Sequence, residues 1–327
     1  MSHLINNLGL GSPWILLALF LAGSFLMIWR LEVMTGRGME GTVLGTLVMP
    51  YCSGMGNLIF VFVLGTTGGP GREVMVNCLV NNVTNLTLLI GLPALFWGMS
   101  FQRGQKRVAK REAKKQNINR LSLLFTMTAV FFFSGAVWAL ARDGVLDFGD
   151  GLVLIGIFIF WQCFHIFEVL KSNVREEKSI HWIIVIDLLL LGIGTYALYV
   201  SVEGLVTWIT NIESGFISKD KLGWLTGWLM VLPNALLALY YGWKRQPDVV
   251  YSSQVGDGHI CIPLCLGNFC LFGTIETPEF FQIGIVFILA STVIHFLFVA
   301  GLGRLPRFMG GFYIIVYAAF LYTGLVQ

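Results

Sequence analysis

Long apolar runs, separated by short polar or Gly- and Pro-rich breaks, dominate the chain. A bilayer core of about 30 Å takes roughly 20 apolar residues per helix, so each run is long enough to predict a membrane-spanning helix. Ten such runs are expected, near residues 13–30, 41–65, 73–98, 121–141, 150–171, 182–202, 223–243, 249–273, 279–302 and 308–326. The pattern therefore predicts an all-α polytopic membrane protein.

The composition agrees with a lipid environment and excludes other classes of protein. Hydrophobic residues make up 56% of the 327 residues and charged residues 12%, with a mean hydropathy of +0.77. A net charge of +3 offers no clustered basic face for phosphates, so nucleic acid is not an expected partner. No Ser-His-Asp, P-loop or Gly-rich nucleotide pattern occurs in a suitable context, so we expect no enzymatic activity.

Charges between the runs indicate the orientation in the membrane. Eight basic residues lie between 103 and 120, and such a block stays on the cytoplasmic side by the positive-inside rule. Alternation of the spans then places acidic connections, such as the one containing Asp143 and Asp147, outside. We expect a multi-pass protein of the cell (inner) membrane with both termini outside the cytoplasm.

Five spans in each half imply that the second half is inverted relative to the first. Residues 1–172 would form one five-helix half, with a repeated polar segment at about 41–98. Residues 173–327 would form the other, with its copy at about 223–273. Inverted repeats place a binding site near the bilayer midplane, between broken helices. A ten-helix protein without this symmetry is the alternative.

Polar residues recur at corresponding positions of the two segments. They are costly in hydrocarbon unless they face a cavity or another helix. Aligning residues 51–93 with 228–267 pairs Asn57 with Asn234, Asn81 with Asp257, Asn85 with Cys261 and Gly91 with Gly267. An internal repeat at these positions favours the inverted architecture.

The two segments resemble the alpha-repeats of sodium/calcium exchangers and their relatives. That pattern runs roughly G-T-S-x-P-E, an apolar helix, a G-x-P-D turn, and G-N-x-x-G-S-N-I-x-N. The second segment fits it without a gap, with Leu232–Asn234 on the first motif, Pro247–Asp248 on the turn and Gly256–Asp257 on the last motif. Around residues 76–92, the asparagines of the last motif fall on Asn77, Asn82 and Asn85. The resemblance implies an exchanger-like fold of two inverted five-helix repeats and a secondary transporter.

The chain departs from this family at its two motif glutamates. Asn57 and Asn234 stand where the family has Glu as a principal calcium ligand. Calcium prefers six to eight oxygens, several of them anionic, so high calcium affinity is not expected. The predicted ion or substrate site then retains one carboxylate and consists of Asn57, Asn81, Asn85, Asn234, Asp257 and His259.

Other interpretations of these residues stay open. The asparagines would also serve as hydrogen-bonding contacts between helices. A candidate soft-metal set consists of His259 and Cys261 with either Cys265 or Asp257, although apolar packing of thiols is commoner. Outside the repeat motifs, we expect structural roles for His165, Glu168, Asp187 and His295.

Two functions are compatible with this sequence. The first is a secondary transporter with alternating access around the asparagines and Asp257. It would need no cofactor, and its ligand would be a small inorganic cation, sodium or calcium, or one whose transport is coupled to protons. The alternative is a transport-inactive exchanger-fold subunit or scaffold, whose aromatic-rich spans contact the lipid bilayer or other subunits of a membrane complex.

Overall fold

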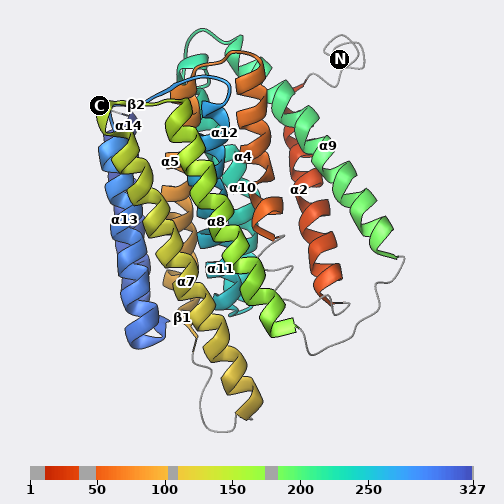
Figure 1. Ribbon diagram of the computed structural model, residues 1–327, viewed down its shortest axis with the longest axis vertical. Coiled ribbons are helices and arrows are strands. Elements are labelled where there is room, and N and C mark those ends of the chain that lie inside the picture. Colours follow the sequence, from red (N-terminus) through yellow and green to blue (C-terminus); the bar gives the residue numbers. More distant parts are fainter. Residues whose placement is uncertain (1–11, 37–48, 102–109, 174–182, 326–327) are drawn as a thin grey trace.

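The computed structural model is a bundle of long helices that run side by side (Figure 1). It describes residues 12–36, 49–101, 110–173 and 183–325. Within these ranges, seven segments are long and apolar enough to cross a membrane, so the chain is a multi-pass membrane protein. Seven spans are regular α-helices for most of their length: α2 (Pro13–Gly36), α4 (Met49–Thr66), α7 (Lys110–Leu140), α8 (Phe148–Asn173), α9 (Ile183–Thr210), α10 (Leu222–Trp243) and α14 (Arg307–Leu325).

Each of the other three spans in the described ranges contains a π-helical turn. The third span consists of α5 (Gly71–Thr84), η2 (Asn85–Leu89) and α6 (Ile90–Trp97). The eighth consists of α11 (Pro247–His259), η5 (Ile260–Cys265) and α12 (Leu266–Cys270), and the ninth of α13 (Phe281–Leu297) and η6 (Phe298–Leu302). All ten predicted runs therefore correspond to helical segments, although residues 41–48 of the second run lie outside the described ranges.

The broken helices expected around the binding site do not include α4 and α10, which carry Asn57 and Asn234. Asn57 lies within α4, and α10 continues through Pro233 and Asn234 as one α-helix. A proline inside a helix removes one hydrogen bond and crowds the carbonyl four residues earlier, and in α10 this does not end the helix. The departures from α-helical geometry lie instead in the third, eighth and ninth spans.

Four two-residue strands connect the halves in a symmetric way. Strand β1 (Met99–Ser100) pairs antiparallel with β4 (Arg304–Leu305), and β2 (Val145–Leu146) pairs with β3 (Ile275–Glu276). Exchanging the two halves converts one pair into the other, because β1 and β3 follow the third and eighth spans. β1 and β2 lie at opposite ends of the bundle (Figure 1), as an inverted repeat requires.

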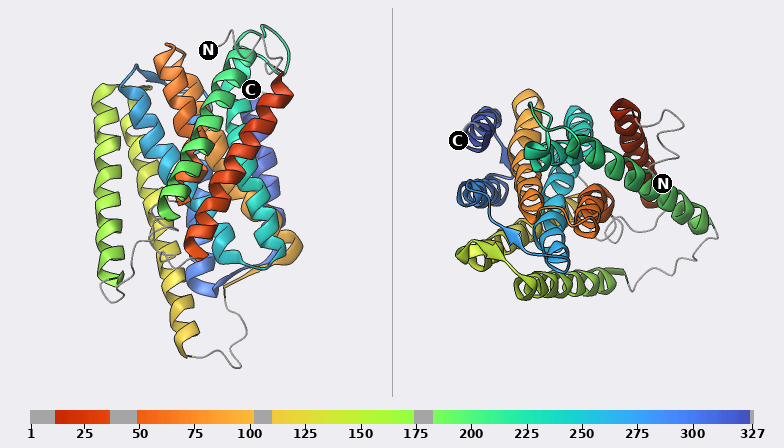
Figure 2. Two further views of the ribbon diagram at one scale, coloured as in Figure 1. Left: turned by 90° about the vertical axis from the view of Figure 1, so that its right-hand side faces the viewer. Right: turned by 90° about the horizontal axis from the view of Figure 1, so that it is seen from above.

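The third and eighth spans lie inside the bundle. In an 18-residue stretch of the third span, 78% is buried, against at most 61% in the other apolar spans of that length in the described ranges. Most residues of α11 and η5 in the eighth span are buried as well. Figure 2 shows α2 and α9 on one side of the bundle and α13 and α14 on the other. Large apolar side chains on the outer helices, such as Trp14, Phe160 and Ile315, are exposed and are suited to contact lipid.

Two short 3-10 helices lie in the connections between spans of the described ranges. η3 (Ala141–Asp143) follows α7, and η4 (Lys219–Lys221) precedes α10. α2 begins and α14 ends at the same end of the bundle (Figure 1), as an even number of crossings requires. The same end holds the start of α10, because Lys221 lines one pocket with Gly324 and Leu325.

Candidate functional site

A proline accompanies the π-helical turn in both central spans. Pro93 in α6 has no N–H for the carbonyl of Leu89, the last residue of η2. Pro263 lies inside η5 and has no N–H for the carbonyl of His259. Because a proline ring also crowds that carbonyl, the backbone widens locally. Turns of this kind release backbone carbonyls to side chains from other helices.

Asp257 is the carboxylate at the centre of the candidate site, and it is fully buried. Its Oδ2 accepts hydrogen bonds from Asn81 Nδ2 at 2.6 Å and Asn85 Nδ2 at 2.8 Å. Asn81 Nδ2 also lies 2.9 Å from Cys261 Sγ. The structure thus brings together four residues that the repeat alignment had paired across the two halves.

Several oxygens in this region have no hydrogen-bond partner among the described residues. They include Asp257 Oδ1, Asn81 Oδ1 and Asn85 Oδ1. The side-chain nitrogen and oxygen of Asn57 and of Asn234 also have no hydrogen-bond partner there. An unpartnered buried polar group costs about 1–3 kcal/mol, so each needs an explanation. A cation would satisfy the oxygens.

Asn57 and Asn234 do not face lipid, because both are fully buried. Their helices, α4 and α10, are in contact at Gly56 and Met230. A Cβ built on Gly56 would lie 2.5 Å from Met230 Sδ. Asn57 follows Gly56 directly, and Asn234 lies one turn beyond Met230. Gln254, one turn before Asp257, donates to the Asn234 carbonyl at 3.3 Å. Both asparagines therefore lie close to the contact between α4, α10 and α11.

The remaining motif asparagines make contacts of the helix-packing kind. Asn77 Nδ2 donates to Thr226 Oγ1 of α10 at 3.0 Å. Asn82 Nδ2 donates to the Cys78 carbonyl, one turn earlier in its own helix, at 2.7 Å. The interpretation as a hydrogen-bonding contact between helices therefore fits Asn77, whereas the Asn82 bond stays within α5.

His259 does not join the carboxylate cluster. Its Nε2 lies 3.1 Å from the Thr126 carbonyl of α7, and its ring packs against Phe133 and Trp161. Residues two apart on a helix point in nearly opposite directions, so His259 turns away from Asp257. In the part of the chain that the structure describes, no three His, Cys, Asp or Glu side chains are grouped to hold a metal ion, and the soft-metal set of His259 and Cys261 with either Cys265 or Asp257 is not assembled.

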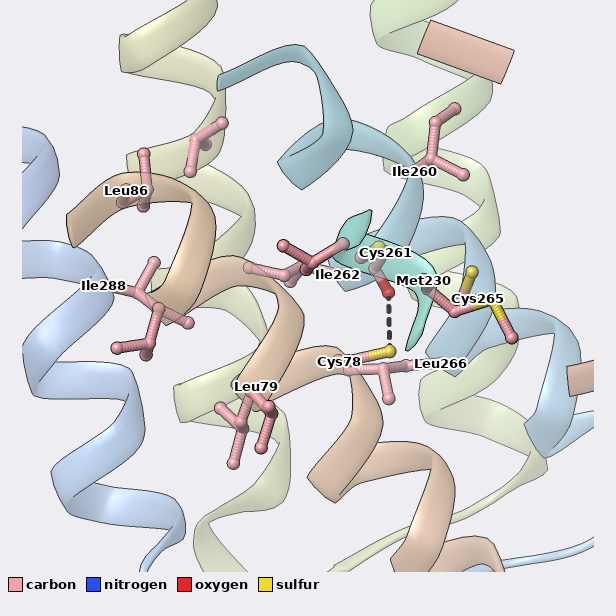
Figure 3. Close-up of a cluster of buried hydrophobic side chains, with 14 of the residues drawn as sticks. Cys78, Leu79, Leu86, Met230, Ile260, Cys261, Ile262, Cys265, Leu266 and Ile288 are labelled. Atoms are coloured by element: carbon pink, nitrogen blue, oxygen red, sulfur yellow. Dashed lines mark hydrogen bonds between the residues drawn. The ribbon is translucent and has the colours of Figure 1, made fainter. Parts of the chain in front are cut away.

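Cys78 also belongs to this region, although no motif in the sequence indicated it. Its thiol donates to the Cys261 carbonyl at 3.2 Å, a bond between the third and eighth spans that Figure 3 shows. The signal was its position three residues before Asn81, on the same helix face. Asp187 forms an ion pair with Arg30 at 3.0 Å, which joins α9 to α2, while the side chains of His165 and Glu168 lie outside the described part.

Comparisons with known proteins agree with this architecture. Residues 10–167 and 186–326 match the family model described as "Sodium/calcium exchanger protein". The fold is similar to that of the sodium-calcium exchanger NCX_Mj soaked with 10 mM Na⁺ and zero Ca²⁺, with a TM-score of 0.67 and 20% identity, covering 97% of this chain and 99% of that one. The same exchanger soaked with 2.5 mM Na⁺ and 10 mM Sr²⁺ gives 0.65 and 19% at the same coverage. No curated protein matches.

Proposed function

The chain belongs to the sodium/calcium exchanger family, and on that premise we propose that it is a secondary transporter of a small monovalent cation. The observation that carries this proposal is the buried Asp257 carboxylate, whose Oδ1 is unpartnered beside the free amide oxygens of Asn81 and Asn85. A carboxylate inside the membrane is costly unless it is paired. A cation in contact with these oxygens would supply the missing partner.

The charge of the site favours a monovalent ion over calcium. Asp257 is its one carboxylate, since Asn57, Asn81, Asn85 and Asn234 are neutral amides. A divalent ion would leave one positive charge without a counter-charge in a water-poor interior, where an unpaired charge costs several kcal/mol. A monovalent ion with Asp257 gives a neutral site. A proton competes for the same carboxylate, so exchange of a cation for a proton is the simplest coupling.

The position of the site fits alternating access. Its residues come from α4, the third span, α10 and the eighth span, which are equivalent elements of the two halves. In inverted-repeat transporters, the halves or bundles rock around a site near the midplane. Asn81 and Asn85 of one half both donate to Oδ2 of Asp257 in the other half. An ion bound there would therefore be held by both halves.

Transport by the purified chain in proteoliposomes tests this proposal. We expect exchange of radiolabelled sodium that acidification inhibits, because protons compete for Asp257. Asp257→Asn keeps the shape of the side chain and removes its charge, so it should abolish the exchange. The control is Asp143→Asn, which removes an exposed carboxylate in the connection after α7 and should leave transport unchanged.

Two outcomes would contradict the proposal. Uptake of radiolabelled calcium that depends on Asp257 would show that the site accepts a divalent ion. A wild-type chain that is folded and monodisperse but moves no cation would favour the alternative, a transport-inactive subunit or scaffold. Stoichiometric co-purification of other membrane proteins would support that alternative further.

A further inference from the structure

His295 of α13 lies outside both repeat motifs, yet it contacts the scaffold of the ion site from two directions. The side chain is fully buried. Its Nε2 lies 2.7 Å from the Leu86 carbonyl in η2, and its Nδ1 lies 3.0 Å from the Tyr251 hydroxyl in α11. The ring stacks on Tyr313 of α14 with a centroid distance of 4.3 Å.

The chemistry of these partners defines the hydrogen bonds. A backbone carbonyl only accepts, so Nε2 carries the proton and donates to Leu86. Nδ1 of the neutral ring is then an acceptor, and the Tyr251 hydroxyl donates to it. Both ring nitrogens are satisfied in this one tautomer. His295 thus acts as a neutral bridge between η2 and α11.

The bridge depends on the π-helical turn. In a regular α-helix the N–H of Ile90 would donate to the Leu86 carbonyl. Here the N–H of Ile90 donates to Thr87 instead, which leaves Leu86 open to a donor from another helix. His295 supplies that donor. The third span therefore takes its shape at this point partly from a side chain of the ninth span.

Both partners of His295 are close to the ion site along their own helices. Leu86 directly follows Asn85, whose amide donates to Asp257 at 2.8 Å. Tyr251 lies six residues before Asp257 in α11, where it is fully buried. A shift of η2 relative to α11 would change the contact between Asn85 and Asp257 first.

We propose that His295 is a positioning residue for the cation site, which it serves by fixing η2 against α11 and thereby Asn85 against Asp257. The inference rests on the proposed function. It assigns a role in transport to a helix that contributes no residue to the cluster. His295 itself touches no ion.

Graded substitutions at His295 test this role through sodium affinity. Gln retains a donor at the place of Nε2, whereas Asn reaches only the place of Nδ1 and Phe keeps the ring without either bond. We expect His295→Phe and His295→Asn to weaken equilibrium binding of radiolabelled sodium about tenfold, equivalent to about 1.4 kcal/mol, roughly the worth of a buried hydrogen bond. His295→Gln should stay within about twofold of wild type.

The control is Thr292→Val in the same helix. It removes a buried hydroxyl whose hydrogen bond among the described residues is to the Ile288 carbonyl of the same helix, so it should change thermal stability slightly and sodium affinity not at all. A purely structural role for His295 predicts loss of stability in the Phe and Asn variants with unchanged sodium affinity, and that result overturns the inference. A wild-type protein that binds no sodium overturns the proposed function as well. If His295→Phe does not fold, the contrast between Gln and Asn decides.

Discussion

At the scale of single residues, the candidate site is rich in amides and has one carboxylate, Asp257. Asn57 and Asn234 are both buried, and neither has a partner for its side-chain polar atoms among the described residues. Asparagine and aspartate have nearly the same shape, so exchanging them changes charge with little change in volume. Charge alone should then decide between a monovalent and a divalent ion.

Adding charge at these two positions should create calcium binding. The double variant Asn57→Asp and Asn234→Asp would bring the site to three carboxylates when Asp257 is counted. We expect it to melt at a lower temperature than wild type in the absence of calcium, because buried like charges repel. Calcium should restore the melting temperature and should bind in a calorimetric titration, whereas wild type should show neither effect.

Asn77→Asp is the matched control for this gain of function. Asn77 is a fully buried amide in α5, the helix that also carries Asn81, but it bonds Thr226 and lies one turn before Asn81. It should lower the melting temperature without a response to calcium. If calcium stabilises this variant as strongly as the double variant, the effect is not specific to the proposed site.

At the scale of helices, each half has a close crossing at which glycines let two helices approach each other. A Cβ on Gly310 of α14 would lie 2.5 Å from the Leu95 nitrogen and 2.6 Å from the Gly91 carbonyl. A Cβ on Gly151 of α8 would lie 2.4 Å from Cys270 Cβ and 3.0 Å from the Gly267 carbonyl. Gly91 and Gly267 are paired in the repeat, so the tenth span packs on the third as the fifth packs on the eighth.

Gly310→Ala should therefore force α14 away from α6. The clash is with backbone atoms, which cannot move aside by a change of rotamer, so we expect a loss of about 1–3 kcal/mol in stability. Gly311→Ala is the neighbouring control, because no atom lies within 4 Å of a Cβ built there. Thermal unfolding in detergent compares the two, and equal melting temperatures would show that the crossing is looser than described.

An element can be predicted from the sequence when its cause lies within one stretch of the chain. Apolar runs predicted all ten spans, because the bilayer imposes length and composition on each run separately. The internal repeat placed Asn81, Asn85 and Asp257 in one candidate site, and in the structure both amides bond the carboxylate. His259 was placed in the site wrongly, since motif membership was given more weight than helix direction. The bridge through His295 could not be predicted, because it depends on a π-helical turn and on the packing of a distant span.

At the scale of the whole molecule, the orientation in the membrane links the fold to the direction of transport. η4 and the end of α14 lie at one end of the bundle, and the connection between α10 and α11, with Lys244 and Arg245, lies at the other. The basic residues between 103 and 120 predict that the Lys244 end is cytoplasmic. Acidic and sparsely charged connections predict that the η4 end is outside.

Cysteines introduced one at a time at the two ends of α10 can decide the orientation in intact cells. Lys219 and Lys244 are both exposed, so Lys219→Cys and Lys244→Cys should be tolerated, in a chain whose exposed Cys163 is first replaced by Ser. A membrane-impermeant maleimide should label the cysteine at 219 in intact cells and the one at 244 only after permeabilisation, because one span separates them. The reverse pattern would place both termini in the cytoplasm and exchange the two faces of the Asp257 site. Labelling of both positions in intact cells would mean that α10 does not cross the membrane. That result would contradict the inverted-repeat mechanism.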